Sequence, residues 1–121
     1  MTTQEVANRY MELEKAGNWL AIHDELYSPD VVCMEPEHAA AMGMQTITSG
    51  LDAIKAKAAA WNAGIEEMHG GYCTEPVVAG NHFSVGMGMD ATMKGAGRMK
   101  LDEIAVFEVK DGKIVKEQFF F

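Results

Sequence analysis

The sequence predicts an α+β fold in which helices cover one face of a curved antiparallel sheet. Helical periodicity is confined to the first half of the chain, and everything from Ile65 onward has strand and turn patterns. The last residues form two strand-like runs around Asp111-Gly112, a dipeptide typical of tight hairpins. Apolar residues lie on both faces of these runs, so helices must cover one face, and a ligand, a second sheet or a second subunit the other.

Two helices are expected at the start of the chain. Thr2 and Glu5 have the spacing of a capping box, and apolar residues follow at helical intervals as far as Gly17, a residue type that favours helix ends. Asn18 can cap a second helix, which Pro29 and the serine before it should end. Only a short connection would therefore separate the two helices.

A strand and a third helix come next. Residues 30–35 have the pattern of a strand that Pro36 stops. Residues 37–48 are rich in Ala, Met and Gly and have no clear period, so we interpret them as a flap or irregular loop. Ser49 and Asp52 have capping spacing in front of a helix whose apolar face includes Trp61.

The second half is expected to consist of strands joined by tight turns. Residues 65–78 and 82–93 form strand-like runs separated by Gly80-Asn81, and residues 94–97 form a turn before the closing hairpin. No linker, internal repeat or low-complexity segment interrupts the chain. We therefore expect residues 1–121 to form a single domain.

The composition disfavours several classes of function. A net charge of −8 disfavours binding to nucleic acids and anionic membranes, because both are negatively charged. No apolar run approaches the ~20 residues of a membrane-spanning helix, and the first residues do not have the pattern of a signal peptide. Cys33 and Cys73 lack metal-binding spacing, as do the histidines. The sequence therefore predicts a cytoplasmic protein without a metal site.

In addition to this order of elements, the chain contains four short sequence motifs: Asn8-Arg9-Tyr10, Tyr27-Ser-Pro-Asp-Val-Val32, Gly50-Leu-Asp-Ala-Ile54 and Asp111-Gly-Lys-Ile114. Together they resemble the nuclear transport factor 2-like superfamily and, within it, the SnoaL-like proteins related to polyketide cyclases and ketosteroid isomerase. The resemblance covers nearly the whole chain. It implies a cone-shaped sheet, three N-terminal helices packed on its concave face, a deep pocket between them and commonly a homodimer. It implies no single reaction, since this fold hosts enzymes and non-catalytic domains alike.

The resemblance also suggests positions for catalytic groups. Isomerases of this superfamily use an acid on the first strand as base, and a tyrosine of the first helix and a late-strand acid as oxyanion donors. Glu35 lies where the base would be, and Tyr10 where the tyrosine would be. The late-strand acid falls on Ala105, so one of the two oxyanion donors has no counterpart here.

Further candidates come from the strand patterns. His69 shares a strand face with Glu67, and a histidine beside an acid is a reasonable proton carrier, although a structural histidine is the commoner case. Asp90 shares a face with glycines that would leave room for a ligand, whereas methionines occupy the opposite face. Alternation alone leaves open which of these faces looks inward. Two interpretations of Glu35 are open: it is either a half-buried carboxylate that acts as a base or a solvated residue at the end of a strand.

The direction of Glu117 depends on the register of the closing hairpin. A two-residue loop at Asp111-Gly112 places Val106 opposite Glu117, whereas a three-residue loop places Ala105 there. The resemblance favours the second case and turns Glu117 toward the pocket. That face would then carry Glu103, Ala105, Phe107, Val115, Glu117, Phe119 and Phe121.

The sequence thus predicts a cofactor-independent enzyme that binds an apolar, ring-containing molecule and moves a proton next to a carbonyl, as an isomerase, cyclase or lyase does. The base would be His69 or Glu35, and Tyr10 would donate to the developing oxyanion. Asp90 would orient or tune the base. The predicted substrate-binding residues are Glu117, Trp61, Phe107, Phe119 and Met89. The competing hypothesis is a non-catalytic homodimer whose pocket binds an apolar ligand and whose histidine and carboxylates form a structural network.

Overall fold

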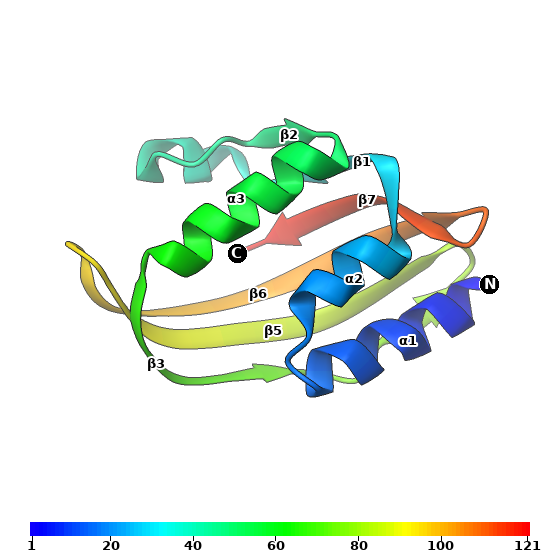
Figure 1. Ribbon diagram of the computed structural model, residues 1–121, viewed down its shortest axis with the longest axis horizontal. Helices are drawn as coiled ribbons and strands as arrows, with labels where there is room; N and C mark the ends of the chain where they lie inside the picture. The colour runs from blue at the N-terminus through cyan, green and yellow to red at the C-terminus, as the bar shows by residue number, and fades with distance from the viewer.

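The computed structural model describes all 121 residues and contains one seven-stranded sheet with helices on one face (Figure 1). The helices are α1 (Thr3–Lys15), α2 (Trp19–Leu26), the 3-10 helix η1 (Glu37–Met42) and α3 (Leu51–Ala63). The strands are β1 (Tyr27–Met34), β2 (Ile47–Ser49), β3 (Ile65–Cys73), β4 (Val77–Ala79), β5 (His82–Met93), β6 (Gly97–Lys110) and β7 (Lys113–Phe120). The α+β fold predicted from the sequence is confirmed.

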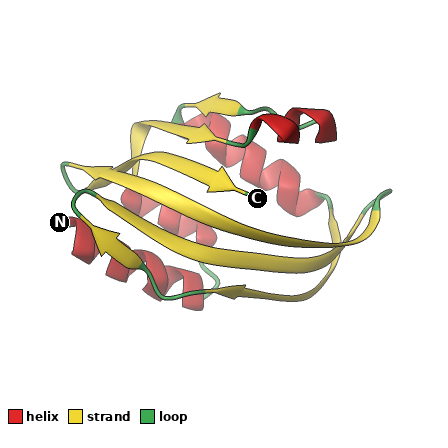
Figure 2. Cartoon of the chain, turned by 180° about the vertical axis from the view of Figure 1, so that it is seen from behind, coloured by secondary structure: helices red, strands yellow, loops and turns green.

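The sheet has the order β2-β1-β7-β6-β5-β3, and β4 also pairs with β5. All neighbouring strands are antiparallel except β1 and β7, which pair in parallel. Viewed from behind, the sheet curves in front of the three α-helices, which all lie on its far side (Figure 2). The expected helical layer on the concave face is therefore present, and η1 is an additional short helix. No helix has the length and apolar character needed to cross a membrane.

The first two helices form as their capping residues predict. The Thr2 hydroxyl accepts a hydrogen bond from the Glu5 backbone N–H at 3.1 Å, and the Glu5 carboxylate accepts one from the Thr2 N–H at 2.9 Å. This reciprocal arrangement satisfies two backbone donors that a helix start would otherwise leave unpaired. The Asn18 side chain caps α2 in the same way, by accepting from Ala21.

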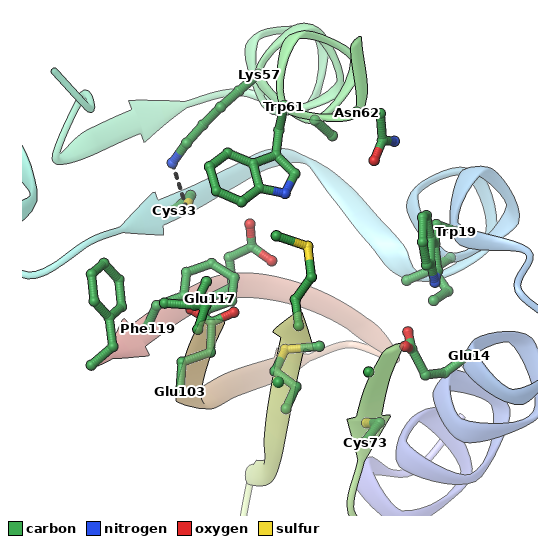
Figure 3. A pocket seen from close by; sticks show the side chains of 18 of the residues that line it. Glu14, Trp19, Cys33, Lys57, Trp61, Asn62, Cys73, Glu103, Glu117 and Phe119 are labelled. Atoms are coloured by element: carbon green, nitrogen blue, oxygen red, sulfur yellow. Dashed lines mark hydrogen bonds between the residues drawn. The ribbon is translucent and has the colours of Figure 1, made fainter. Parts of the chain in front are cut away.

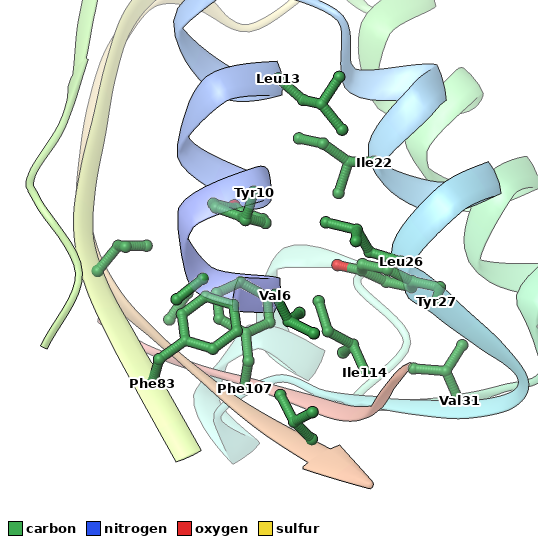
Figure 4. Packing of buried hydrophobic residues seen from close by; sticks show 14 of the residues in the cluster. Val6, Tyr10, Leu13, Ile22, Leu26, Tyr27, Val31, Phe83, Phe107 and Ile114 are labelled. Carbon is green, nitrogen blue, oxygen red and sulfur yellow. The ribbon is translucent and has the colours of Figure 1, made fainter. Parts of the chain in front are cut away.

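The hydrophobic core lies where α1 and α2 pack on the sheet (Figure 4). The Tyr10 ring of α1 lies 5.0 Å from the Phe107 ring and 5.6 Å from the Phe83 ring, measured between centroids. Phe83 and Phe107 stack on adjacent strands at 4.7 Å. Each large apolar side chain buried in this way contributes about 1.5–3 kcal/mol. Of α3, by contrast, only Ile54 is buried, so this helix contributes little to the core.

Three local predictions need correction. First, β1 begins at Tyr27 and contains Pro29, because its pairing with β7 is interrupted between Tyr27 and Val32 and no ladder hydrogen bond is required of the proline. Second, residues 37–48 contain η1 and most of the edge strand β2 instead of an irregular loop. Third, α3 begins at Leu51, and its N-cap residue is Gly50, so Ser49 does not cap it.

The run 65–78 is also not one strand. It is divided into β3 and β4 around Pro76, which lacks the N–H that a continuous ladder needs. Both pieces still pair with β5, at opposite ends of that long strand. The turn at Gly80-Asn81 and the bounds of β5 agree with the sequence prediction.

The closing hairpin combines a two-residue loop with a bulge. Lys110 pairs with Lys113, and Asp111 and Gly112 both have positive φ, 51° and 76°, as a type I′ turn requires. The register then shifts by one residue in β7, so that Glu117 lies opposite Phe107. Neither predicted register is correct, but the bulge still turns Glu117 toward the helices.

Candidate functional site

A cavity of about 1000 Å³ lies between the sheet and the three α-helices (Figure 3). It lies beside the packed core, and α3 buries only Ile54 on this side of the sheet. Hydrophobic residues make up 23 of its 36 lining residues, so polar groups that point into it are largely removed from water. Its size suits a ligand of several rings.

Seven of the nine predicted site residues line this cavity. They are Tyr10, Glu35, Trp61, Met89, Phe107, Glu117 and Phe119. In Figure 3, Trp61 points down from α3 into the cavity, above Glu103 and Glu117 on the sheet. Tyr10 is buried in the aromatic core but also borders the cavity.

The other two predicted residues, His69 and Asp90, lie outside the cavity, and their expected placement in the pocket is corrected here. Met87 and Met89 of β5 face inward, so Asp90 faces outward by alternation. There it accepts two hydrogen bonds from Arg98, at 3.0 and 2.9 Å, and this pairing lowers the pKa of the Asp90 carboxyl. His69 lies where the β3–β5 register shifts, with its Nε2 atom 2.7 Å from the Thr92 hydroxyl.

Glu35 forms an ion pair with Lys57 inside the cavity. Its Oε1 atom lies 2.8 Å from the Lys57 ammonium, and the Glu35 side chain is only 7% exposed. Burial is the largest single influence on Lys57 and lowers its pKa, but the hydrogen bond and charge of Glu35, together with the adjacent Cys33, outweigh burial and raise the lysine pKa. The Cys33 sulfur lies 3.6 Å from the same ammonium (Figure 3), and burial raises the pKa of its thiol, which therefore stays protonated.

Glu117 is paired differently, with the hydroxyl of Tyr27. The hydroxyl donates to the Glu117 Oε2 atom, and both side chains are buried. Burial raises the pKa of the Glu117 carboxyl, although the Tyr27 hydrogen bond favours its ionised form. Burial, together with the nearby Glu117 carboxylate, also raises the pKa of Tyr27. The tyrosine is therefore a hydrogen-bond donor at neutral pH.

Glu103 is the third carboxyl on the cavity wall, and it lacks a partner. Burial and, to a lesser extent, the nearby Glu35 and Glu117 carboxylates together raise its pKa to about 7, and only Lys57 opposes the shift. No hydrogen bond contributes to the shift. A carboxyl with this pKa is present in both protonation states at neutral pH, so it can accept a proton and give it back.

The sequence analysis placed Glu103 on the inward strand face but assigned it no role, and it missed Lys57 and Tyr27 as site residues. The signal for Glu103 was available, because it shares a strand face with Ala105 and Phe107 and a carboxylate on such a face is costly. For Lys57 the signal was its position four residues before Trp61, which places both on one helix face. No three His, Cys, Asp or Glu side chains are arranged to hold a metal ion.

Comparisons with known proteins place this geometry in context. A family model described as a SnoaL-like domain matches residues 1–121. A protein from Mesorhizobium loti that is proposed to be a SnoaL-like polyketide cyclase is 30% identical, with a TM-score of 0.90 and full coverage of both chains. No curated protein matches the sequence.

Two more distant structures share the fold alone. TerC, co-crystallised with polyporic acid, is 20% identical with a TM-score of 0.74, and the match covers 98% of this chain and 90% of TerC. A protein from Catenulispora acidiphila with a ketosteroid isomerase-like fold, solved in complex with trimethylamine, is 20% identical with a TM-score of 0.66. That match covers 84% of this chain and 72% of the other.

Proposed function

The chain belongs to the SnoaL-like family, and from this premise we propose that it is a cofactor-independent enzyme acting on an apolar, ring-containing molecule. The reaction would move a proton next to a carbonyl, as in an isomerase, cyclase or lyase. The observation that carries the proposal is the unpaired Glu103 carboxyl, whose pKa of about 7 suits proton transfer at neutral pH.

In the proposed reaction, the Glu103 carboxylate takes a proton from the carbon next to the substrate carbonyl. The electron pair left behind forms an enolate, whose oxygen accepts hydrogen bonds from the Lys57 ammonium and the Tyr10 hydroxyl. The protonated Glu103 then returns its proton to another carbon of the same molecule, so that protons and electrons balance. Glu35 would hold Lys57 in place through their ion pair.

The remaining predicted residues would bind the substrate. The Trp61 ring reaches from α3 into the cavity, and Phe119 lies on the opposite wall (Figure 3). Phe107 and Met89 extend the apolar surface along the sheet. Glu117, fixed by Tyr27, would raise the basicity of Glu103 through its negative charge.

The test is turnover of α,β-unsaturated ketones and cyclic polyketide mimics by the wild type and by Glu103→Gln. We expect the variant to lose a factor of about 10²–10⁴ in kcat, the usual contribution of a general base. His69→Ala is the matched control, because His69 is a titratable residue outside the cavity, and its rate should stay within about twofold of wild type.

The pH dependence gives a second readout of the same proposal. Because the ionised carboxylate is the base, kcat/KM should rise with pH through about 7 and then level off. Lys57→Met should move this rise to higher pH, since the lysine charge lowers the Glu103 pKa. Equal rates for the wild type and Glu103→Gln would remove Glu103 from the mechanism.

A second candidate function is ligand binding without catalysis. Two carboxylates of the cavity already have partners within the chain, Glu35 with Lys57 and Glu117 with Tyr27. Such pairs would suit a structural network and favour this second function. An NMR titration of Glu103 separates the two functions. A pKa near the ordinary value of about 4.3 would favour the structural network, and a value near 7 the enzyme.

We further propose that the protein acts as a homodimer through the face of the sheet away from the helices, called the outer face here. Ile47, Ile104 and Phe120 are each about half exposed, and Ile104 lies opposite Phe120 in the β6–β7 pair. A second copy of the chain would cover these side chains. The unpaired cysteines support a reducing compartment, the cytoplasm, as its location.

A further inference from the structure

The end of the cavity beside α1 and α2 contains a carboxyl that the proposed reaction does not use. Glu14 lies one helical turn after Tyr10 and Met11, whose side chains face the sheet, so its carboxyl is directed inward. Figure 3 shows it near Trp19, across the cavity from Glu103 and Phe119. Burial raises the pKa of Glu14, and the nearby Trp19 indole N–H opposes this shift.

No basic side chain of the protein neutralises this carboxyl. Lys15 also lines the cavity, but its ammonium lies 2.9 Å from Glu75 and its side chain is largely exposed, and the Lys57 ammonium is held by Glu35 at the other end. His23 also lines the cavity, but burial lowers its pKa, so the imidazole is neutral at physiological pH. Glu14 is thus an acid facing a ligand-sized space without a counter-charge from the chain.

The aromatic residues around this space have the chemistry that complements a cation. Trp19 at the start of α2 lines the cavity close to Glu14, whereas Trp61 lines it from α3, above Glu103 and Glu117 (Figure 3). Indole rings attract ammonium groups through the negative charge on their faces, more strongly than other aromatic rings. A partly buried carboxyl beside an indole therefore favours a positively charged group over a neutral one of the same shape.

We propose that this end of the cavity binds an alkylammonium group, so that the ligand carries a basic nitrogen at one end and its reacting carbonyl at the other. The inference rests on the proposed function for the position of the carbonyl, but the binding of the ammonium group can be tested without turnover. It assigns a substrate class, an amine-bearing ring compound, to the cavity.

The test compares two probes of identical shape, benzyltrimethylammonium and its uncharged carbon isostere neopentylbenzene, titrated against tryptophan fluorescence. The wild type should bind the cation at least tenfold more tightly than the isostere. Glu14→Gln should weaken binding of the cation about tenfold and leave binding of the isostere unchanged. Glu12→Gln is the matched control, because it removes the same charge from the exposed side of α1 and should change neither affinity.

Glu103→Gln locates the cation within the cavity. If the ammonium group lies beside Glu14, this variant should keep the preference for the cation. The inference is overturned if the wild type binds the isostere as tightly as the cation, or if Glu103→Gln removes the preference and Glu14→Gln does not. Turnover of neutral ketones without any cation preference would overturn this inference and leave the proposed function intact. Failure of both probes to bind would overturn the inference as well.

Discussion

Three of the glutamates that line the cavity differ in their hydrogen-bond partners, and these partners determine whether each carboxyl can exchange a proton. Glu35 has a lysine partner and Glu117 has a tyrosine partner, whereas Glu103 has neither. A partner that donates to a carboxylate favours the charged form, and burial without such a partner favours the neutral form. The same residue type therefore serves as an anchor at two positions and as a proton carrier at the third.

The raised pKa of Glu103 makes a prediction about stability. The folded protein holds the proton until about pH 7, whereas the unfolded chain releases it near 4.5, so between these values the folded state binds more protons. Stability from this group is therefore present below pH 4.5 and is lost as the pH rises toward and past 7. Glu103→Gln should be more stable than wild type at pH 8, by about 1–2 kcal/mol after allowance for solvent screening.

Urea unfolding at pH 4.5 and pH 8 measures this difference. The gap between the two proteins should be close to zero at the lower pH and should grow with pH. Glu66→Gln, which removes an exposed carboxyl of β3, is the control and should show no such growth. A gap independent of pH would mean that Glu103 titrates alike in the folded and unfolded states.

At the scale of elements, much of the secondary structure could be predicted from local signals. The capping box at Thr2, the cap at Asn18 and the turn at Gly80-Asn81 each act through neighbouring residues, and each lies where the sequence places it. The edge strand β2 could not be predicted, because its three residues have no period and depend on pairing with β1.

Long-range geometry also limited what could be predicted of the site. Alternation divides β5 into two faces but does not say which face the helices cover, so Asp90 and Met89 could not be told apart. The bulge in β7 depends on how the whole sheet twists, and it produced a register that loop length alone does not give. The inward position of Glu103 was predicted from its strand face, but its lack of a partner could not be, because that depends on which distant side chains reach it.

The pairing of β3 with β5 makes a prediction at the element scale. On the outer face, the Tyr72 ring lies over Gly88 and its hydroxyl donates to Asp102 at 2.7 Å. A Cβ atom at Gly88 would lie 2.1 Å from the ring, so Gly88→Ala must displace Tyr72 and break this hydrogen bond. We expect a loss of about 1–2 kcal/mol in the free energy of unfolding.

The double mutant separates this cause from others. In a Tyr72→Ala background the ring is gone, and Gly88→Ala should become neutral or slightly stabilising, because alanine is preferred to glycine in strands. Gly70→Ala is the control, since nothing lies within 4 Å of its added Cβ. Equal costs of Gly88→Ala in both backgrounds would show that the clash with Tyr72 is not the cause. Thermal or urea unfolding measures the wild type and the four variants.

At the scale of the whole molecule, packing and ligand space are separated along the sheet. The core lies under α1 and α2, where Tyr10, Phe83 and Phe107 are closely packed. The cavity lies between the sheet and all three α-helices, and α3, which covers one end of it, contributes one buried residue. The polar side chains of the site therefore sit beside the core and interrupt it little.

The outer face leads to a prediction about assembly. If two copies associate there, Ile104→Asp combined with Phe120→Asp should convert the protein to a monomer, because charged groups would be buried without partners. Sedimentation equilibrium should show twice the chain mass for the wild type and the single chain mass for the variant. Leu20→Asp, which changes a 75% exposed residue of α2, should leave the assembly unchanged. A wild type that sediments as a monomer would contradict the homodimer.

The loosely anchored α3 has a consequence for how this protein can change over generations. Positions that face the cavity from this helix, such as Ala58 and Trp61, contribute little to the packed core, so substitutions there cost little folding stability. Natural variation can therefore alter the shape and charge of the cavity wall that α3 forms, while the rest of the molecule stays folded. One helix thereby becomes the part through which descendants of this chain can acquire new ligands.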